Sequence, residues 1–312
     1  MDTAPTGIFE RTYTSDDYIV HCVIDCDIIK ELQYTGLKVK LIEKEYYGQS
    51  GNNPVLGFDL IPETDEYNSQ LSMTPGLAAI FRSWGFIGDS LCAGEMEYYT
   101  NEDKVGQTDM FEYSWGMYIA QMCGASGTVF ARGGNTAKSW LEMPEGNHGL
   151  IDCKKDPKDA YIIALGQNDC VATDMTCGSV SSDINKSNKD QNGNTFAGYY
   201  GKIIQNLREI KPKCYIFVVT LPRADKSDWN KVIRDMCTTF DNVFCIDLEK
   251  YSNMYASSEF KKRYFMNGHM NAAGYLYTAY LFMHVIDYQV RHNPEKFYGV
   301  SLINTDYKPS KD

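Results

Sequence analysis

Hydrophobic and polar positions follow one pattern up to about residue 80 and another beyond it. From about residue 82, short apolar runs alternate with longer segments whose apolar residues recur at helical spacing. The runs predict strands at 84–87, 128–131, 160–165, 214–220 and 243–246, and the segments predict helices near 112–123, 136–142, 195–210, 228–239 and 271–291. Continuously apolar strands separated by helices are typical of a parallel sheet covered on both faces. We therefore expect an α/β protein with a three-layer α/β/α sandwich.

The first 80 residues lack this alternation. Residues 17–24 and 36–42 are rich in β-branched side chains and partly alternate between apolar and polar, which is typical of strands. A turn-forming cluster follows them at 48–54. We therefore expect a small N-terminal β-rich region at 1–80 and a main domain at 81–312.

Composition and charge narrow the class of partner. The 312 residues are 43% hydrophobic and 23% charged, as in ordinary globular proteins. With 30 Lys and Arg against 41 Asp and Glu, the net charge is −11, which repels nucleic-acid phosphates and an anionic membrane surface. No apolar run reaches the roughly 18 residues of a membrane-spanning helix, and no basic segment followed by an apolar stretch opens the chain. We expect a cytoplasmic protein that binds neither nucleic acid nor membrane.

The ten cysteines are scattered along the chain. Zinc sites usually have paired spacings, and Cys22 and Cys26 have no second pair at such a distance. Several other cysteines lie in apolar runs, where cysteine behaves as a small hydrophobic residue. We expect reduced core thiols and no metal, which also suits the cytosol.

Glycines and polar residues follow three of the expected strands directly. The segments are Gly88-Asp89-Ser90, Gly133-Gly134-Asn135 and Gly166-Gln167-Asn168-Asp169. Parallel sheets bind ligands at these strand ends. Taken alone, each segment has a plain structural explanation, because Ser90 suits a helix cap, a glycine pair suits a turn, and Asn168 suits either. The functional alternative is an exposed hydroxyl beside free amides and a side-chain amide that together face a developing anion.

His269 lies just before the last expected helix, in Asn267-Gly268-His269-Met270-Asn271. A lone histidine is more often structural than catalytic, and the other four histidines receive only that interpretation: His21, His148, His284 and His292.

The joint order of these motifs is more specific than any one of them. Gly-Asp-Ser, then Gly, then Gly-x-Asn-Asp, then a late His resembles the SGNH (or GDSL) esterase family over about residues 82–291. The resemblance implies a flavodoxin-like SGNH hydrolase fold. It also implies that Ser90 is the nucleophile and that His269 is the general base. The three oxyanion donors would be the backbone amides of Ser90 and Gly134 and the side chain of Asn168.

The chain departs from the family at the acid that orients the imidazole. The family places an Asp three residues before the His, and that position is Met266 here. A backbone carbonyl near Met266 would give a Ser-His dyad, because an imidazole tautomer needs only a well-placed acceptor. A carboxylate such as Asp247 or Glu259 would restore a triad, and a third alternative is an impaired site. The dyad is the favoured hypothesis.

Three side chains near these motifs are interpreted as structural or solvent-exposed rather than functional. Glu95 and Glu97 follow the nucleophile and are expected on a solvated face rather than against substrate. Trp140 lies in an amphipathic helix and is expected in the core rather than in a substrate pocket.

The resemblance and the residue chemistry together predict a cofactor-independent serine esterase that hydrolyses carboxylic esters through an acyl-serine intermediate. Short acyl esters, such as O-acetyl groups on carbohydrates, are the first expectation, and a thioesterase or lysophospholipase would use the same mechanism. The missing acid favours a rival, a non-catalytic carbohydrate-binding or interaction protein on the same fold. A nucleotide- or flavin-binding domain is disfavoured because no Gly-rich phosphate loop follows a strand.

Overall fold

The computed structural model describes residues 76–99, 105–251, 258–297 and 300, and before them the backbone of four strands. The chain divides into two compact units, Met1–Thr74 with Lys250–Ser252 and Pro75–Glu249 with Asn253–Asp312. In the first unit, the strands form two antiparallel pairs: β1 (Ile8–Thr14) with β2 (Ile19–Asp25), and β3 (Leu37–Leu41) with β4 (Phe58–Pro62). The two strands expected in this region are therefore present, and the turn expected at 48–54 lies outside the described residues.

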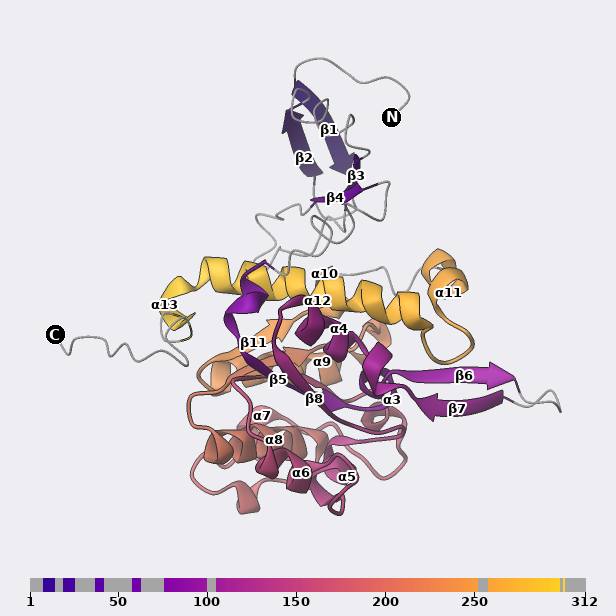
Figure 1. Cartoon of the computed structure of the whole chain (residues 1–312). Helices are drawn as coiled ribbons and strands as arrows, with labels where there is room; N and C mark the ends of the chain where they lie inside the picture. The colour runs from indigo at the N-terminus through magenta and orange to yellow at the C-terminus, as the bar shows by residue number, and fades with distance from the viewer. Residues whose placement is uncertain are drawn as a thin grey trace. The chain divides into compact units, whose positions relative to one another are not determined.

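The second unit is built on a five-stranded parallel sheet with the order β11-β10-β9-β5-β8 (Figure 1). Its strands are β5 (Ser83–Gly88), β8 (Ser126–Ala131), β9 (Ala160–Ala164), β10 (Tyr215–Val219) and β11 (Val243–Ile246). All five lie within two residues of the bounds expected from the sequence. The chain order reverses between β5 and β9, which is where ligands bind in open α/β sheets.

Helices cover both faces of this sheet (Figure 1). On one face α4 (Trp115–Met122) packs against α12 (Ala272–His292), and on the other α8 (Phe196–Ile210) contacts its neighbours on both sides. Those neighbours are α5 (Ala137–Glu142), α6 (Leu150–Lys155) and α9 (Ser227–Thr239). The three-layer α/β/α sandwich expected from the sequence is confirmed.

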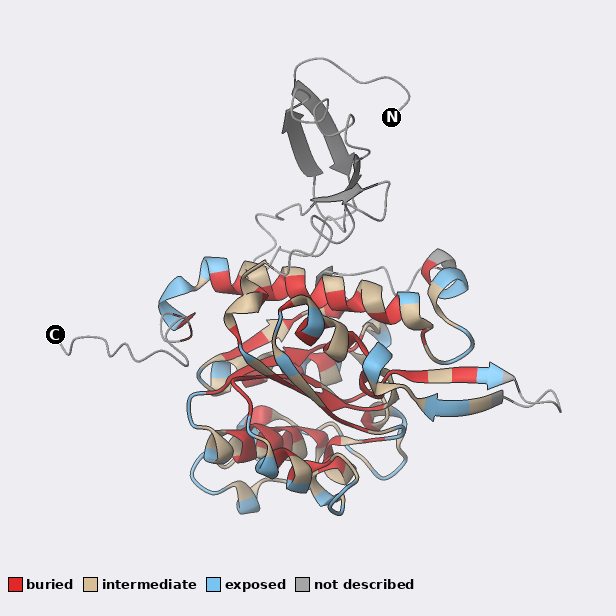
Figure 2. Cartoon of the chain, in the orientation of Figure 1, coloured by how far each residue is buried: buried red, intermediate tan, exposed pale blue. Residues whose placement is uncertain are grey.

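Each face of the sheet has its own buried apolar core (Figure 2). On the α8 face, Tyr200 of α8 and Trp140 of α5 are fully buried, and the Trp140 indole donates to the Phe130 carbonyl at 2.8 Å. Trp140 is thus a core residue, as expected. On the α12 face, Trp115 packs against Phe282 with ring centroids 4.9 Å apart. These rings hold α12, and with it the segment just before its N-terminus, against the sheet.

A hairpin that the sequence analysis did not identify leaves the sheet just after β5 (Figure 1). It pairs β6 (Glu95–Tyr99) with β7 (Val105–Asp109) in antiparallel register. The remaining short elements are η1 (Gly76–Ile80), α3 (Ser90–Ala93), η2 (Phe111–Tyr113), η3 (Asp169–Val171), α7 (Val180–Asp183), η4 (Lys189–Gln191), η5 (Ala224–Lys226), α10 (Leu248–Tyr251), α11 (Ser258–Tyr264) and α13 (Pro294–Phe297).

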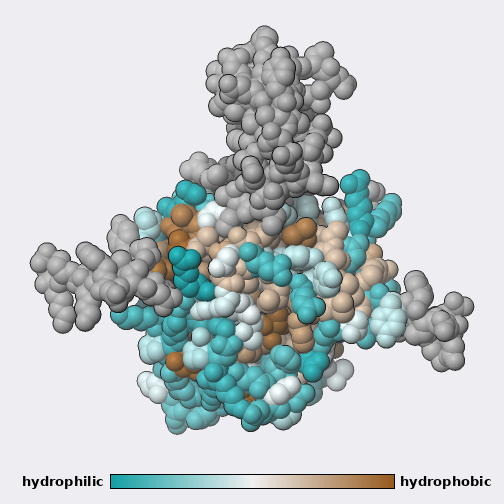
Figure 3. Space-filling model, in the orientation of Figure 1, coloured by the Kyte–Doolittle hydropathy of each residue, from teal (hydrophilic) through white to brown (hydrophobic). Residues whose placement is uncertain are grey.

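The surface drawn in Figure 3 is mostly hydrophilic over the layer that contains α6 and α8, which bury only their inner faces. None of the described helices combines the length and apolar character needed to cross a membrane. The described cysteines are free thiols: Cys92, Cys123, Cys153, Cys170, Cys177, Cys214, Cys237 and Cys245.

Candidate active site

Three neighbouring strand ends bring the predicted site residues together. Ser90 opens α3 directly after β5, Gly134 follows β8, and Asn168 follows β9. Because β5 lies between β8 and β9 in the sheet, the three loops meet at one edge. Asp89 caps α3, since its carboxylate accepts a hydrogen bond from the Leu91 amide at 3.0 Å.

A chain of hydrogen bonds links the three loops. The Asn168 side-chain amide donates to the Asn135 carbonyl at 3.0 Å, and the Asn135 amide donates to the Gly88 carbonyl at 3.2 Å. The Asp169 carboxylate accepts from the Ala137 amide at 2.9 Å. Only one of the two Asn168 amide hydrogens is used in this way, so the other is free for a ligand.

Glycine is required at the two adjacent positions 133 and 134 for different structural reasons. Gly134 has a φ of 78°, in the left-handed region that favours glycine, and nothing lies within 4 Å of the place of a Cβ atom. A Cβ on Gly133 would lie 2.3 Å from the Glu95 Oε2 atom. Within the described residues, the backbone amides of Gly134 and Ser90 donate to no protein atom. Both amides are therefore available to an oxyanion.

His269 joins the nucleophile to a carboxylate. Its Nε2 atom lies 3.0 Å from Ser90 Oγ, and its Nδ1 atom lies 2.7 Å from Glu97 Oε1. The same Glu97 oxygen accepts from the Gly268 amide at 2.9 Å. Hydroxyl, imidazole and carboxylate thus form a continuous hydrogen-bonded line, the arrangement that activates a serine.

Glu97 is suited to orient the imidazole. Its side chain is only 4% exposed. Burial alone raises the pKa of this carboxyl group, but hydrogen bonds from His269 and Gly268 outweigh burial and lower the pKa below its usual value. An ionised carboxylate at Nδ1 holds the ring proton there, which leaves the Nε2 lone pair facing Ser90.

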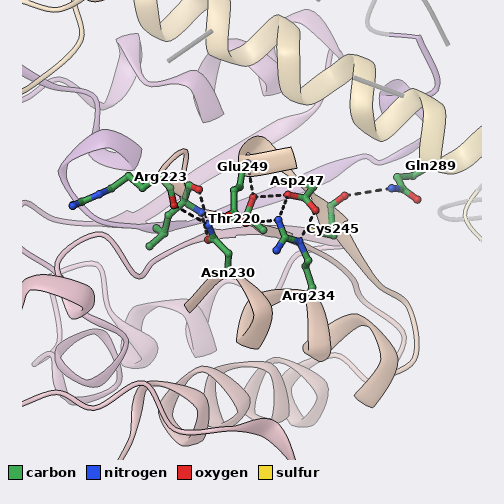
Figure 4. Close-up of polar contacts among 9 residues, drawn as sticks. Thr220, Arg223, Asn230, Arg234, Cys245, Asp247, Glu249 and Gln289 are labelled. Atoms are coloured by element: carbon green, nitrogen blue, oxygen red, sulfur yellow. Dashed lines mark hydrogen bonds and ion pairs between the residues drawn. The ribbon is translucent and has the colours of Figure 1, made fainter. Parts of the chain in front are cut away.

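This geometry corrects the expected acceptor for the imidazole. The Nδ1 atom meets Glu97 rather than a carbonyl near Met266, whose amide instead donates to the His269 carbonyl at 2.9 Å. Asp247 is engaged elsewhere (Figure 4), because it accepts from Arg234 at 2.6 and 2.7 Å and from Thr220 at 3.1 Å. Glu259 falls in α11, and its side chain lies outside the described residues.

The expectation that Glu95 and Glu97 lie on a solvated face is wrong. As whole residues, Glu95 and Glu97 are 8% and 9% exposed. In a strand, residues two apart point to the same side, so β6 directs both carboxylates toward His269. Glu95 Oε1 lies 3.2 Å from His269 Nε2. The alternating Glu-Met-Glu sequence was the available signal, and only a strand assignment would have given it meaning.

A cavity of about 410 Å³ opens beside Ser90 and His269. Its walls include the apolar side chains of Trp115, Val219, Leu221, Leu248, Phe265 and Phe282. The buried Asn230 side chain fixes one wall, because it bonds both the amide and the carbonyl of Leu221, at 2.7 and 2.9 Å (Figure 4). Among the described residues, no cluster of three or more His, Cys, Asp and Glu side chains is arranged to hold a metal ion.

The buried acid Asp89, next to the nucleophile in sequence, makes a pH-dependent contribution to stability that can be tested. Burial, with a smaller effect of the nearby Asp169 carboxylate, raises the pKa of Asp89 from 3.8 to about 7. The folded state therefore holds a proton that the unfolded state releases between about pH 4 and 7, and this group loses stabilising effect as the pH rises through that window. Asp89→Asn keeps the cap acceptor. We expect its free energy of unfolding, relative to that of the natural protein, to rise by about 2 kcal/mol from pH 5 to pH 8.

Urea unfolding at the two pH values measures this difference. Asp241→Asn, at an exposed position, is the matched control and should show no pH-dependent gain. A gain for Asp89→Asn that is equal at both pH values, or larger at pH 5, would contradict the assignment.

The comparisons with known proteins agree with this architecture. The GDSL-like lipase/acylhydrolase family matches residues 86–276, more than half of the chain. The chain belongs to this family, and the resemblance seen in its sequence is confirmed. The protein is therefore a hydrolase of the esterase type. Among curated proteins, none matches the chain.

Several solved structures are similar in fold. A GDSL-like lipase, described as putative, from Bacteroides ovatus is 18% identical, with a TM-score of 0.43, and the match covers 69% of this chain and 99% of that one. A family two carbohydrate esterase from Cellvibrio japonicus is 16% identical, with a TM-score of 0.45 and coverages of 67% and 62%. A carbohydrate esterase of the same family from Corynascus thermopiles is 16% identical, with a TM-score of 0.46, and the match covers 66% of this chain and 65% of that one. This chain thus spans about two thirds of each carbohydrate esterase.

Proposed function

We propose that the protein is a serine esterase that hydrolyses carboxylic esters through an acyl-serine intermediate. The observation that carries this proposal is the hydrogen-bonded line from Ser90 through His269 to Glu97. Three donors that bond no acceptor among the described residues lie at the same strand ends as Ser90: the amides of Ser90 and Gly134 and the second hydrogen of Asn168. Family membership supports ester chemistry, and the geometry of the line supports its serine mechanism.

In the first half-reaction the Ser90 oxygen attacks the ester carbonyl carbon while its proton passes to His269 Nε2. The carbonyl π electrons move to the carbonyl oxygen, and the three donors stabilise the resulting oxyanion. When the tetrahedral intermediate collapses, the C–O bond to the alcohol breaks. The leaving oxygen takes the proton from Nε2, which produces a neutral alcohol and the acyl-serine.

In the second half-reaction water replaces the alcohol. Nε2 takes one water proton as the water oxygen attacks the acyl carbon, and the same donors hold the second oxyanion. Collapse breaks the bond to Ser90 Oγ, which recovers its proton from Nε2. The products are one carboxylic acid and one alcohol, and Glu97 keeps its charge throughout.

Short acyl esters of carbohydrates, with O-acetyl as the first candidate, are the proposed substrates. A thioester or lysophospholipid would use the same residues. The cavity beside Ser90 has room for more than an acetyl group, so acyl length is a variable to measure. The main reason for the rival, non-catalytic interpretation was a missing acid, and the Glu97 carboxylate 2.7 Å from His269 Nδ1 supports the catalytic interpretation instead.

A panel of esters tests the proposal. Purified protein is assayed with p-nitrophenyl acetate, butyrate and octanoate, with acetylated xylose, and with an acyl thioester. We expect turnover of at least one oxygen ester. An acyl adduct on Ser90, detected by mass spectrometry after rapid acid quench, is also expected. No turnover on any ester, together with retained binding of a carbohydrate, would support the rival binding protein instead.

Asn168→Ala should lower kcat/KM for the best ester by about 10²–10³, because one donor to the oxyanion is lost. Asn194→Ala, on an exposed loop, is the matched control and should retain the natural rate. Circular dichroism checks that both variants fold. A folded Asn168→Ala enzyme with the natural kcat/KM would remove this residue from the oxyanion site.

A further inference from the structure

The carboxylate of Glu95 lies at the catalytic centre and takes no part in the mechanism above. Its side chain is 11% exposed, and Oε1 lies 3.2 Å from His269 Nε2, the atom that also faces Ser90 at 3.0 Å. Among the described residues, no lysine, arginine or backbone amide bonds this carboxylate. Arg132, the nearby cation, is paired with Asp109 at 3.1 Å.

Glu95 is nevertheless firmly placed. The buried Tyr275 hydroxyl donates to the Glu95 backbone carbonyl at 2.6 Å, which ties β6 to α12. On the other side, Gly133 lacks a side chain where the Glu95 carboxylate lies, since a Cβ would approach Oε2 to 2.3 Å. The carboxylate is thus held by its surroundings, and among the described residues only the His269 imidazole comes within hydrogen-bond distance of it.

With its ring proton on Nδ1, the neutral imidazole is not a donor to this carboxylate. Glu97 holds the ring proton on Nδ1, so Nε2 is a lone pair that accepts from Ser90. Glu95 Oε1 and Nε2 are then two acceptors facing each other. Burial together with the neighbouring acids Asp109 and Glu97 raises the pKa of Glu95, while His269 opposes the shift. A donor supplied by a ligand would satisfy the carboxylate.

We propose that Glu95 is a specificity residue that binds a hydroxyl group on the carbon next to the ester oxygen, so that the preferred substrates are esters of polyhydroxy alcohols. This inference rests on the proposed function. The leaving oxygen must come within hydrogen-bonding distance of Nε2 to receive its proton. An atom 3.2 Å from the same Nε2 therefore lies within about 6 Å of that oxygen, a span that a neighbouring hydroxyl bridges.

The location of Glu95 assigns it to the alcohol rather than to the acyl group. The apolar cavity lies along Ser90, Asn168 and His269 and does not include Glu95 among its walls. The carboxylate instead lies against Gly133, which is also not among those walls. An apolar acyl group suits the cavity, and a hydroxyl-bearing alcohol suits the carboxylate.

The test compares two esters that differ by one hydroxyl, ethyl acetate and ethylene glycol monoacetate. We expect the natural enzyme to favour the glycol ester in kcat/KM by about 10- to 100-fold, the range for a hydrogen bond to a charged group. In Glu95→Ala this ratio should fall to within about threefold of one. Glu95→Gln keeps a neutral acceptor and should give an intermediate ratio. Glu112→Gln, at an exposed position, should keep the natural ratio.

Each other outcome has a defined meaning. If both esters lose rate equally in Glu95→Ala, the residue positions His269 and the inference is overturned. A natural enzyme that hydrolyses both esters at equal kcat/KM also overturns it, and leaves the esterase proposal intact. Acetylcholine, an acetate ester with a cationic alcohol, is a third substrate. If the enzyme prefers acetylcholine but not the glycol ester over ethyl acetate, the carboxylate recognises charge rather than a hydroxyl, which again contradicts the inference. Absence of all ester hydrolysis would instead refute the proposed function itself.

Discussion

Ser90→Ala should lower kcat for ester hydrolysis by about 10⁶, to near the rate left by the oxyanion donors alone. His269→Ala should cost about as much, because without the imidazole the serine proton has no acceptor at 3.0 Å. The double variant should be no slower than either single one, since the two residues act as a unit. Initial rates on the best ester of the panel, with protein purified apart from host esterases, measure all three.

Ser182→Ala, at an exposed position far along the chain, is the matched control and should keep the natural kcat. Thermal unfolding verifies that the alanine variants are folded. Residual activity above a tenth of the natural rate in folded Ser90→Ala would mean that another nucleophile carries the reaction.

Glu97→Gln should lower kcat by about 10³–10⁴, the cost of replacing the orienting carboxylate of a serine triad by an amide. The amide presents a donor as well as an acceptor to Nδ1 and carries no charge to stabilise the imidazolium. KM should change little, because the loss falls on the transition state. Steady-state kinetics on the same ester separates the two constants.

Asp247→Asn is the sharp comparison, because Asp247 was an alternative acid and the structure pairs it with Arg234. It should keep kcat within about threefold, although it weakens a partly buried ion pair and lowers stability. If Glu97→Gln retained kcat while Asp247→Asn lost it, the assignment of the acid would be reversed. If neither moved kcat, a backbone acceptor and a Ser-His dyad would be favoured.

The sheet and its main helices follow from local patterns that are strong in this sequence. Each central strand is a continuous apolar run because helices bury both of its faces, so its position needed no knowledge of the partners. The loops that carry residues 90, 134 and 168 follow from the same pattern, because parallel strands end at one edge, whereas the roles of these residues came from the family resemblance. His269 required the family resemblance, since a single histidine before a helix carries no chemistry by itself.

Glu97 could not be assigned in the same way. It bonds a residue 172 positions away, and the alternation in Glu95-Met96-Glu97 indicates a shared strand face but not the residue that this face contacts. The hairpin that carries it is short, and polar residues on a hairpin are normally solvated. Contacts of β6 with Gly268 and Tyr275, which are distant in sequence, help to remove these carboxylates from water. The expected acceptor near Met266 was therefore wrong, because the carboxylate comes from β6.

Because the hairpin carries Glu97, the nucleophile and the orienting acid lie on one segment of the chain and the base lies on another. Ser90 and Glu97 lie on one short stretch of chain that emerges from β5, whereas the imidazole arrives on the turn before α12. Both ring nitrogens bond that one stretch. A displacement of the turn by a single hydrogen-bond length would therefore break the two contacts of the base simultaneously, so proton transfer depends on the docking of one loop rather than on the alignment of three independent pieces.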